Sequence, residues 1–306
     1  MLADRMRMCS GSKNGLWVIV GGNGKLAVSK DAQLWELKDA GFGTTGIARI
    51  FYGNGLWIAV GSSKIATSPD GITWTQRTSP FGIDTGIYGI AYGNGTWVIG
   101  GSGGKIATSS DGINWTLRTN HPFITSDYVY RIAHNGSNLF VALGSNANKA
   151  ENKIVTSLDG INWTKRTTGF TNPDGDIAYG NGLWVAGGEG GKIITSPDGM
   201  NWTERISGLT DYLYSAAYGK NLWIAVGGKG KISTSPDGIN WTPRTIQNWY
   251  ANYYCFSVAY GNGLWIVAGG GPSVEDEMAT SPDGINWTMA ANVFITTSIA
   301  NITYGK

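Results

Sequence analysis

The chain has 306 residues, a formal net charge of +2, 47 glycines and 14 tryptophans, and only 14% of its residues are charged. This composition excludes a disordered chain, and the lack of a dense lysine and arginine run argues against nucleic acid as a partner. No stretch approaches the roughly 18 uninterrupted apolar residues of a membrane span, so none is expected.

The N-terminal segment, MLADRMRMCSGSKNG, carries charges but lacks the apolar core of a secretory signal. We therefore expect a protein that stays where it is made, or leaves by lysis or inside an assembly. Cys9 and Cys255 give no disulfide framework, and with His121 and His134 they do not make a credible zinc site. Neither a metal nor another cofactor is expected.

The chain is built from a repeated motif, S-x-D-G-x-x-W-T, which we call the box. Its aspartates recur every 39 to 48 residues, which indicates one structural unit per copy. A worn copy, SKDAQLW, opens the series at residues 29–35, and the others lie at 68–75, 109–116, 157–164, 196–203, 235–242 and 281–288.

Each unit reads as four short strands. In the second unit these are GIARIFY (46–52), LWIAVG (56–61), KIATS (64–68) and TWTQRT (73–78). Asn-Gly between the first two is a strong signal for a two-residue hairpin turn. Periods near 40 residues with four strands each are typical of a β-propeller, whose blades bury their faces against one another. We therefore predict an all-β fold: one seven-bladed propeller of four-stranded antiparallel blades over residues 1–306.

The two ends of the chain complement each other. The final segment, SIANITYGK (298–306), matches the first strand of a unit, and the NGLW that should follow it begins at Asn14. We expect the C-terminal strand to join the first blade and close the ring, which removes exposed sheet edges. The alternative makes RMRMCS (5–10) the inner strand of that blade.

The boxes resemble the Asp box, or bacterial neuraminidase repeat, of sialidase-like β-propellers, although here Asp and Gly are one residue closer than usual. Units of the YGNGLW…TSPDGINWT type are similar to those of phage tail or virion proteins and bacterial surface proteins. The resemblance implies the propeller fold, with the box as a turn remote from any active site. It also favours a virion-associated location, with the cytoplasm or the cell surface by another export route as the alternatives.

The repeated carboxylates and arginines are interpreted as structural. A catalytic carboxylate is needed once or twice at one place, whereas the box Asp occurs in every unit. A sialidase-type site requires three arginines on inner strands, a Tyr/Glu pair and an acid; only Arg49 and Arg131 lie on inner strands outside the repeat register. We expect no enzyme and no catalytic residue, with Arg49 and Arg131 as central-cavity candidates and a sialidase-like glycoside hydrolase as the alternative.

The connections that vary in length should gather on one face of the disc, which we call the variable face; the hairpin and box turns occupy the invariant face. Loops freed from the repeat are where a binding site can be built. Two such segments are IQNWYANYYCF (246–256) and NHPFITSDYVY (120–130). They supply the candidate binding residues Trp249, Tyr250, Tyr253, Tyr254, His121, Phe123 and Tyr128.

Exposed aromatic side chains suit stacking on a sugar or anchoring a protein. An equally weighted alternative is that Trp249 only caps the blade tops. The sequence thus predicts a non-enzymatic binding or structural module. Its expected partner is a glycan or a protein, such as another virion component or a cell-surface component.

Overall fold

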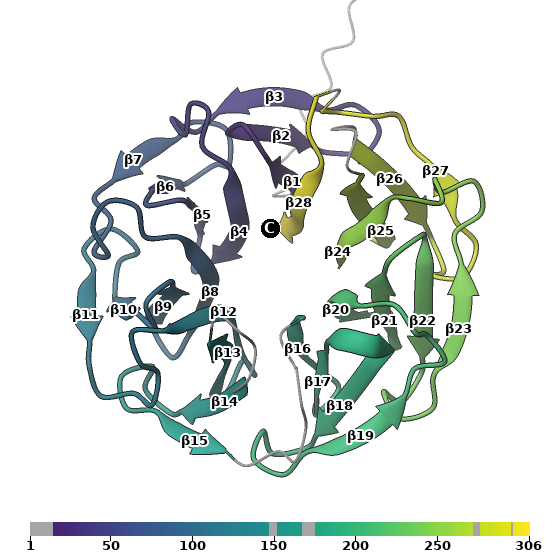
Figure 1. Ribbon diagram of the computed structural model, residues 1–306. Helices are drawn as coiled ribbons and strands as arrows, with labels where there is room; N and C mark the ends of the chain where they lie inside the picture. The colour runs from purple at the N-terminus through teal and green to yellow at the C-terminus, as the bar shows by residue number, and fades with distance from the viewer. Residues whose placement is uncertain (1–14, 147–151, 167–174, 272–275, 295) are drawn as a thin grey trace, which may run out of the picture.

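Seven four-stranded antiparallel sheets form a closed ring in the computed structural model, which describes residues 15–146, 152–166, 175–271, 276–294 and 296–306 (Figure 1). This confirms the all-β, seven-bladed prediction. The described helical structure is a single 3-10 turn, η1 (Glu189–Gly191). None of the helical structure in these ranges has the length and apolar character needed to cross a membrane.

In six blades the strands run outward from the centre of the ring in chain order; in the first blade, β28 lies innermost, followed by β1, β2 and β3. The inner strands surround the centre of Figure 1: β4 (Ile47–Gly53), β8 (Ile87–Gly93), β12 (Asp127–His134), β16 (Ile177–Gly180), β20 (Leu213–Gly219), β24 (Tyr254–Gly261) and β28 (Ile299–Gly305). The second strands are β5 (Leu56–Gly61), β9 (Thr96–Gly101), β13 (Phe140–Asn146), β17 (Leu183–Gly187), β21 (Leu222–Gly227), β25 (Leu264–Gly270) and β1 (Leu16–Gly21).

The third and fourth strands complete each blade toward the rim. The third strands are β2 (Lys25–Ser29), β6 (Ile65–Ser68), β10 (Ile106–Ser109), β14 (Asn152–Ser157), β18 (Lys192–Ser196), β22 (Lys231–Ser235) and β26 (Asp276–Ser281). The outermost strands are β3 (Glu36–Asp39), β7 (Thr75–Arg77), β11 (Thr116–Arg118), β15 (Thr164–Arg166), β19 (Thr203–Ile206), β23 (Thr242–Thr245) and β27 (Thr288–Met289).

The Asn-Gly dipeptides form the expected hairpin turns between first and second strands. In the turn from β4 to β5, Asn54 has φ of 49° and Gly55 has φ of 74°. Two consecutive positive φ angles match the right-handed twist of the flanking strands, and Asn and Gly tolerate them best. These turns therefore fix the register of the inner hairpins from local sequence alone.

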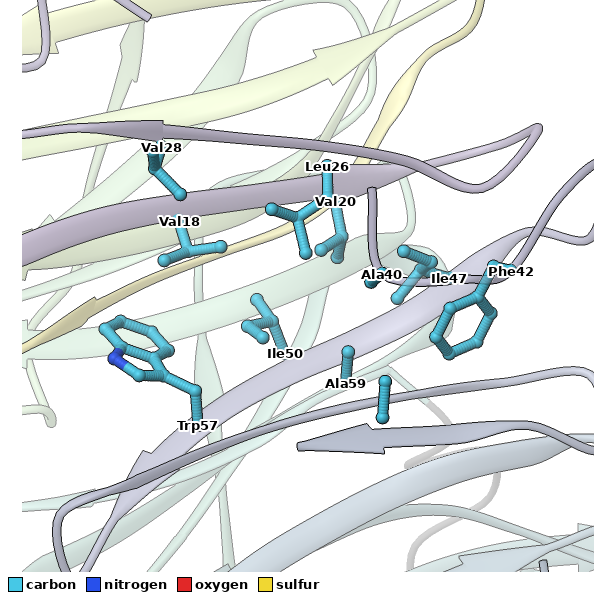
Figure 2. Packing of buried hydrophobic residues seen from close by; sticks show 11 residues of the cluster. Val18, Val20, Leu26, Val28, Ala40, Phe42, Ile47, Ile50, Trp57 and Ala59 are labelled. Atoms are coloured by element: carbon cyan, nitrogen blue, oxygen red, sulfur yellow. The ribbon is translucent and has the colours of Figure 1, made fainter. Parts of the chain in front are cut away.

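The hydrophobic core lies between neighbouring blades. Figure 2 shows one such layer, in which Val18 and Val20 of β1 face Ile50 of β4 and Trp57 of β5. All four side chains are at most 2% exposed. Because each blade buries both of its faces in this way, its second strand carries apolar residues almost continuously rather than in alternation, as LWIAVG of β5 does.

The ring closes through the C-terminal strand. β28 pairs with β1 from Leu16↔Gly305 to Gly21↔Ile299, which confirms that the last strand completes the first blade. The competing inner strand at 5–10 lies outside the described residues. Closure leaves the first blade with the same four strands as the other six, so neither chain end leaves an unpaired inner edge.

The box forms a hydrogen-bonded turn around its aspartate. In the sixth copy, Ser235 Oγ donates to Asp237 Oδ1 (2.8 Å), and the backbone N–H groups of Gly238 and Asn240 donate to Ser235 Oγ and Asp237 Oδ1 (both 2.8 Å). The bond from the Asn240 N–H contributes most to holding the pKa of Asp237 below its usual range. The Trp241 indole N–H caps the turn by donating to the Gly238 carbonyl (2.9 Å). The box carboxylates therefore stabilise turns.

The repeat arginines are held within their own blades. The Arg118 Nε–H on β11 donates to Thr108 Oγ1 on the adjacent β10 (2.8 Å). Equivalent bonds, between 2.8 and 3.0 Å, join Arg77, Arg166, Arg205 and Arg244 to the threonines of their third strands. Five bonds of one kind explain why arginine recurs in this register without a ligand.

Candidate functional site

The inner strands enclose a central channel with a cavity of about 370 Å³. All seven blades contribute to its wall, from Arg49 in the β4 blade to Asn301 in the β28 blade. A cavity of this size accommodates a small ligand or the end of a peptide. Because the surrounding strands are paired and packed on both sides, its wall is rigid.

One equivalent position on the inner strand of each blade lines this channel. It lies three residues before the Tyr or His of the hairpin turn, and we call it the channel position. Near the start of six inner strands, the residue just before the channel position is skipped in the pairing with the second strand. These strands are β4, β8, β12, β20, β24 and β28. In chain order the channel positions are Arg49, Gly89, Arg131, Asp176, Ser215, Ser257 and Asn301.

Four channel side chains tie their blade to the next one. Each accepts a hydrogen bond from the backbone N–H that follows the channel position of the neighbouring inner strand. The accepting side chains are Asn301, Asp176, Ser215 and Ser257, whose donors are the N–H groups of Ile50 (3.0 Å), Ala216 (3.4 Å), Val258 (3.4 Å) and Ile302 (3.2 Å). From β16 round to β4, the protein's own side chains thus accept the hydrogen bonds of the N–H groups that face the channel.

The other three channel positions are Arg49, Gly89 and Arg131, which offer no acceptor. Arg131 Nε lies 3.3 Å from Asp176 Oδ1, and the second Asp176 oxygen accepts from Ser215 Oγ (2.8 Å). Arg49 Nη2 is buried and has no hydrogen-bond partner among the described residues. The two arginines predicted for the central cavity thus line one cavity, and only Arg131 has a countercharge within ion-pair distance.

Arg49 is a poorly compensated cation. The residue is 9% exposed. Burial, followed by the neighbouring Arg131 charge, lowers the pKa of Arg49 to about 9, with Asp176 opposing that shift. A guanidinium in water keeps its proton at pH values well above 9. The lowered pKa therefore shows that the site disfavours an unpaired positive charge.

Aromatic side chains gather where the inner strands begin, at the channel mouth on the variable face. Tyr88, Tyr128 and Tyr130 form a first group, in which Tyr128 and Tyr130 stack with centroids 5.7 Å apart and planes 6° apart. The second group joins β20 and β24 at centroid distances of 4.7 to 5.8 Å and comprises Tyr212, Tyr214, Tyr254 and Phe256. Most of these rings are half-buried, and Tyr254 is 38% exposed.

Trp249 does not present an exposed ring, which favours the alternative that it caps the blade tops over an exposed binding contact. It is 7% exposed and packs in the core around Ile232 and Cys255. A side chain at Gly230 would collide with Trp249, since an added Cβ would lie 2.6 Å from the Trp249 Cβ. Tyr253 is also buried, at 8%. Both aromatics fill the space above the blades because an apolar ring of this size gains more from burial than from exposure.

His121 and Phe123 also contact other parts of the protein rather than presenting exposed rings. Phe123 is 5% exposed and belongs to the core beneath β12. His121 Nε2 lies 2.9 Å from the Arg118 carbonyl at the end of β11. The expected exposed aromatic surface is therefore wrong for Phe123, while Tyr128 is half-buried and stacks on Tyr130 where β12 begins.

Tyr250 is the most exposed of the candidate residues, at 63%. Its backbone N–H donates to Glu277, at 3.1 Å to Oε1. Glu277 is 2% exposed, and burial raises its pKa to about 7 despite this hydrogen bond. The 246–256 connection is thus anchored by a buried carboxyl on β26, while the Tyr250 ring extends to solvent.

Sequence reasoning missed the channel positions as a set. It singled out Arg49 and Arg131 by their type, but Asp176, Gly89 and the accepting residues escaped attention. Aligning the units on the turn Tyr or His would have exposed them, because this position varies among R, G, R, D, S, S and N while the residue that follows it is always a small or branched apolar one. Across the described ranges, no group of three or more His, Cys, Asp or Glu side chains is arranged to hold a metal ion.

Comparison with known proteins identifies the fold. A scan against family models finds no match, and a search of curated proteins finds none either. Among solved structures, YCF48 from Cyanidioschyzon merolae matches with a TM-score of 0.64 and 14% identity over 84% of this chain and 89% of that one. YCF48 bound to D1 peptide matches with a TM-score of 0.61 and 18% identity, covering 89% and 86%.

AztD from Citrobacter koseri matches with a TM-score of 0.59 and 12% identity over 95% of this chain and 97% of that one. At these identities the matches establish the seven-bladed propeller architecture and leave the ligand to be inferred from the site itself.

Proposed function

We propose that this chain is a non-enzymatic binding module that recognises a protein partner through its variable face. The observation that carries the proposal is the clustering of half-exposed tyrosines around the mouth of a preformed channel. Aromatic side chains are the commonest anchors of protein interfaces, since they bury a large area at a small cost in conformational entropy. Tyr250, Tyr254 and Tyr128 are the candidate contacts.

The scaffold and one comparison support this proposal. The site is built on paired strands and connecting loops above a rigid ring, which is the usual placement of a recognition surface. A propeller of similar architecture is described as bound to a peptide. A glycan stacked on the same tyrosines would require the same surface, and the experiment below separates the two.

We further propose that the module is virion-associated and works as part of a phage tail. The support is the resemblance of its repeats to those of phage tail and virion proteins. The partner would then be another virion component or a component of the host cell surface.

A second candidate is a sialidase-like glycoside hydrolase, favoured by one observation: Arg49 and Arg131 share the channel with a carboxylate, Asp176, and with Tyr88. The remaining geometry opposes it. No glutamate is among the channel-lining residues that the structure describes, and Asp176 is engaged by Arg131 and Ser215. A nucleophile and an acid with free oxygens are therefore lacking at this place.

The test selects a displayed peptide library on the immobilised full chain, in parallel with a glycan array, and measures affinities for variants. Tyr250→Ala and Tyr254→Ala should each weaken binding several-fold, because one anchoring ring contributes about 1 kcal/mol or more. Leu158→Ala is the matched control, since Leu158 is 64% exposed and lies in a box turn on the invariant face.

Binding that is unchanged in both tyrosine variants, or that is lost in Leu158→Ala, would refute the proposal. Array binding lost in the tyrosine variants would assign a glycan. Turnover of a sialoside that disappears in Arg49→Ala would establish the hydrolase instead.

A further inference from the structure

The ring of blade-to-blade hydrogen bonds is incomplete on one side of the channel. Asn301, Asp176, Ser215 and Ser257 each offer an oxygen to the next inner strand. Along β4 and β8 the equivalent residues are Arg49 and Gly89. Arginine only donates hydrogen bonds and glycine has no side chain, so neither position supplies an acceptor. Arg131 on β12 offers no acceptor either, so the Ile177 N–H beside Asp176 has none among the described side chains.

On β8 and β12, two further backbone donors face the channel without the side-chain acceptor that their counterparts have. They are the N–H groups of Ile90 and Ile132, which occupy the same register as those of Ile50 and Val258. No side chain among the described residues is found to accept from either one. An added Cβ at Gly89 would lie 3.3 Å from the Ile132 nitrogen, which shows where the missing side chain would sit.

The third donor on this arc is the Arg49 guanidinium. Its Nη2 is buried without a partner, and the residue is nine-tenths buried. A buried charge without a counterion is costly and persists where something else compensates it. Three donors on one stretch of wall, none of which has a side-chain acceptor among the described residues, indicate a site for an oxygen-bearing anion.

The charges of the channel fix the valence of that anion. Arg49 and Arg131 contribute two positive charges to the lining and Asp176 contributes one negative charge, which leaves a net charge of +1. His134, also in the lining, stays neutral near pH 7, because burial lowers its pKa. One carboxylate would bring the net charge to zero, whereas a doubly charged phosphate or sulfate would overshoot.

We propose that the arc formed by Arg49, Ile90 and Ile132 binds a carboxylate, which takes the place of the missing acceptors and completes the ring of hydrogen bonds. This inference rests on the proposed binding function and names the group of the partner that enters the channel. A carboxylate can come from a peptide or from an acidic sugar, and both present the same chemistry to the arc.

Thermal unfolding of the full chain in sodium acetate and in sodium chloride, at matched ionic strength, tests the proposal. Acetate should raise the unfolding midpoint above that in chloride, since a ligand that binds only the folded state stabilises it. Arg49→Asn provides the acceptor that Asn301 provides in its own blade. It should therefore raise the midpoint in chloride and abolish the response to acetate.

Gly89→Ser places a hydroxyl where Ser215 and Ser257 have theirs, and it leaves Arg49 unchanged. Because the new side chain would occupy the space beside the Ile132 N–H, acetate binding should weaken at least several-fold. Lys30→Asn is the matched control, because it removes one exposed positive charge outside the channel lining and should respond to acetate as the wild type does. Equal midpoints in acetate and chloride for the wild type, or an undiminished acetate response in Arg49→Asn, would overturn the proposal.

The source of the carboxylate follows from two matched pairs of probes. A short peptide with a free C-terminus is compared with its amidated form, and glucuronate is compared with glucose. Tighter binding of the free peptide than of its amide assigns a peptide carboxylate, and tighter binding of glucuronate than of glucose assigns an acidic sugar. Acetate binding that survives in Tyr250→Ala and Tyr254→Ala, while partner binding is lost, separates this site from the surface proposed above. If the wild type does not respond to acetate but its partner binding is lost in the tyrosine variants, the carboxylate site alone is refuted.

Discussion

Single residues show where the chain departs from its own repeat, and the departures are concentrated in the channel and beneath the 246–256 connection. Arg49 occupies a position where other blades place Ser, Asp or Asn, and its buried Nη2 has no partner in the described structure. Glu277 is a second buried charge-bearing group, 2% exposed beneath Tyr250. Such residues cost stability unless a partner compensates them.

Glu277 should make the protein less stable as the pH rises. Its folded-state pKa is raised from 4.5 to about 7, so the folded state binds more protons than the unfolded state between these values. The free energy of unfolding therefore falls as the pH increases from 4.5 to about 7 and is level above. Glu277→Gln keeps an oxygen for the Tyr250 N–H and should be about 1–3 kcal/mol more stable than the wild type near pH 8.

Urea unfolding of both proteins across this pH range provides the measurement. Near pH 4 the two should be equally stable, because the carboxyl is protonated in both states. An advantage of Glu277→Gln that is independent of pH would contradict this account of the buried carboxyl.

At the scale of elements, the tryptophans of the second strands and those of the boxes play different parts. The second-strand tryptophans are fully buried between blades; Trp223, for example, is 0% exposed. The box tryptophans are mostly half-buried, and four of them cap their turns by donating to a glycine carbonyl, as the Trp241 indole does. The second-strand position thus supplies blade-to-blade packing, while the box position does so only in part.

The two kinds of tryptophan should differ in their contribution to stability. Trp223→Ala removes a fully buried ring and should lower the free energy of unfolding by about 3–5 kcal/mol. Trp241→Ala, in the same blade, should lower it by about half as much, because part of the ring already contacts water. Chemical denaturation of both variants gives the comparison. Equal losses would show that the box ring is as important to the core as its buried neighbour.

The elements could be predicted from the sequence because their signals are local. Asn-Gly defines the hairpins, Ser and Asp define the box turn, and the repeat fixes the number of blades. The site could not be predicted in the same way. Whether Trp249 lies on the surface depends on the space above Gly230, and the pairing of Arg131 with Asp176 joins residues 45 positions apart in different blades. Packing between blades decides both.

The whole molecule depends on closure of the ring by its last strand. β28 supplies the innermost strand of the first blade, and Asn301 on it accepts the hydrogen bond from the Ile50 N–H of the next blade. Removal of residues 298–306 should therefore expose the edge of β1 and the buried face beside Trp57. Because an unpaired apolar edge promotes association, we expect loss of the cooperative transition and aggregation.

Size-exclusion chromatography with a thermal unfolding scan of the truncated chain provides the measurement. Adding the missing strand as a synthetic peptide should restore part of the transition. A monomeric truncated chain that unfolds as cooperatively as the full one would show that closure is dispensable.

The central claim is that this closed ring presents a channel whose arc of donors receives a carboxylate. A crystal structure of the full chain grown with sodium propionate tests it most directly. The account predicts density for the carboxylate within hydrogen-bond distance of Arg49 Nη2 and of the Ile90 or Ile132 N–H. A channel that holds only water, with Arg49 paired to another protein group, would contradict it.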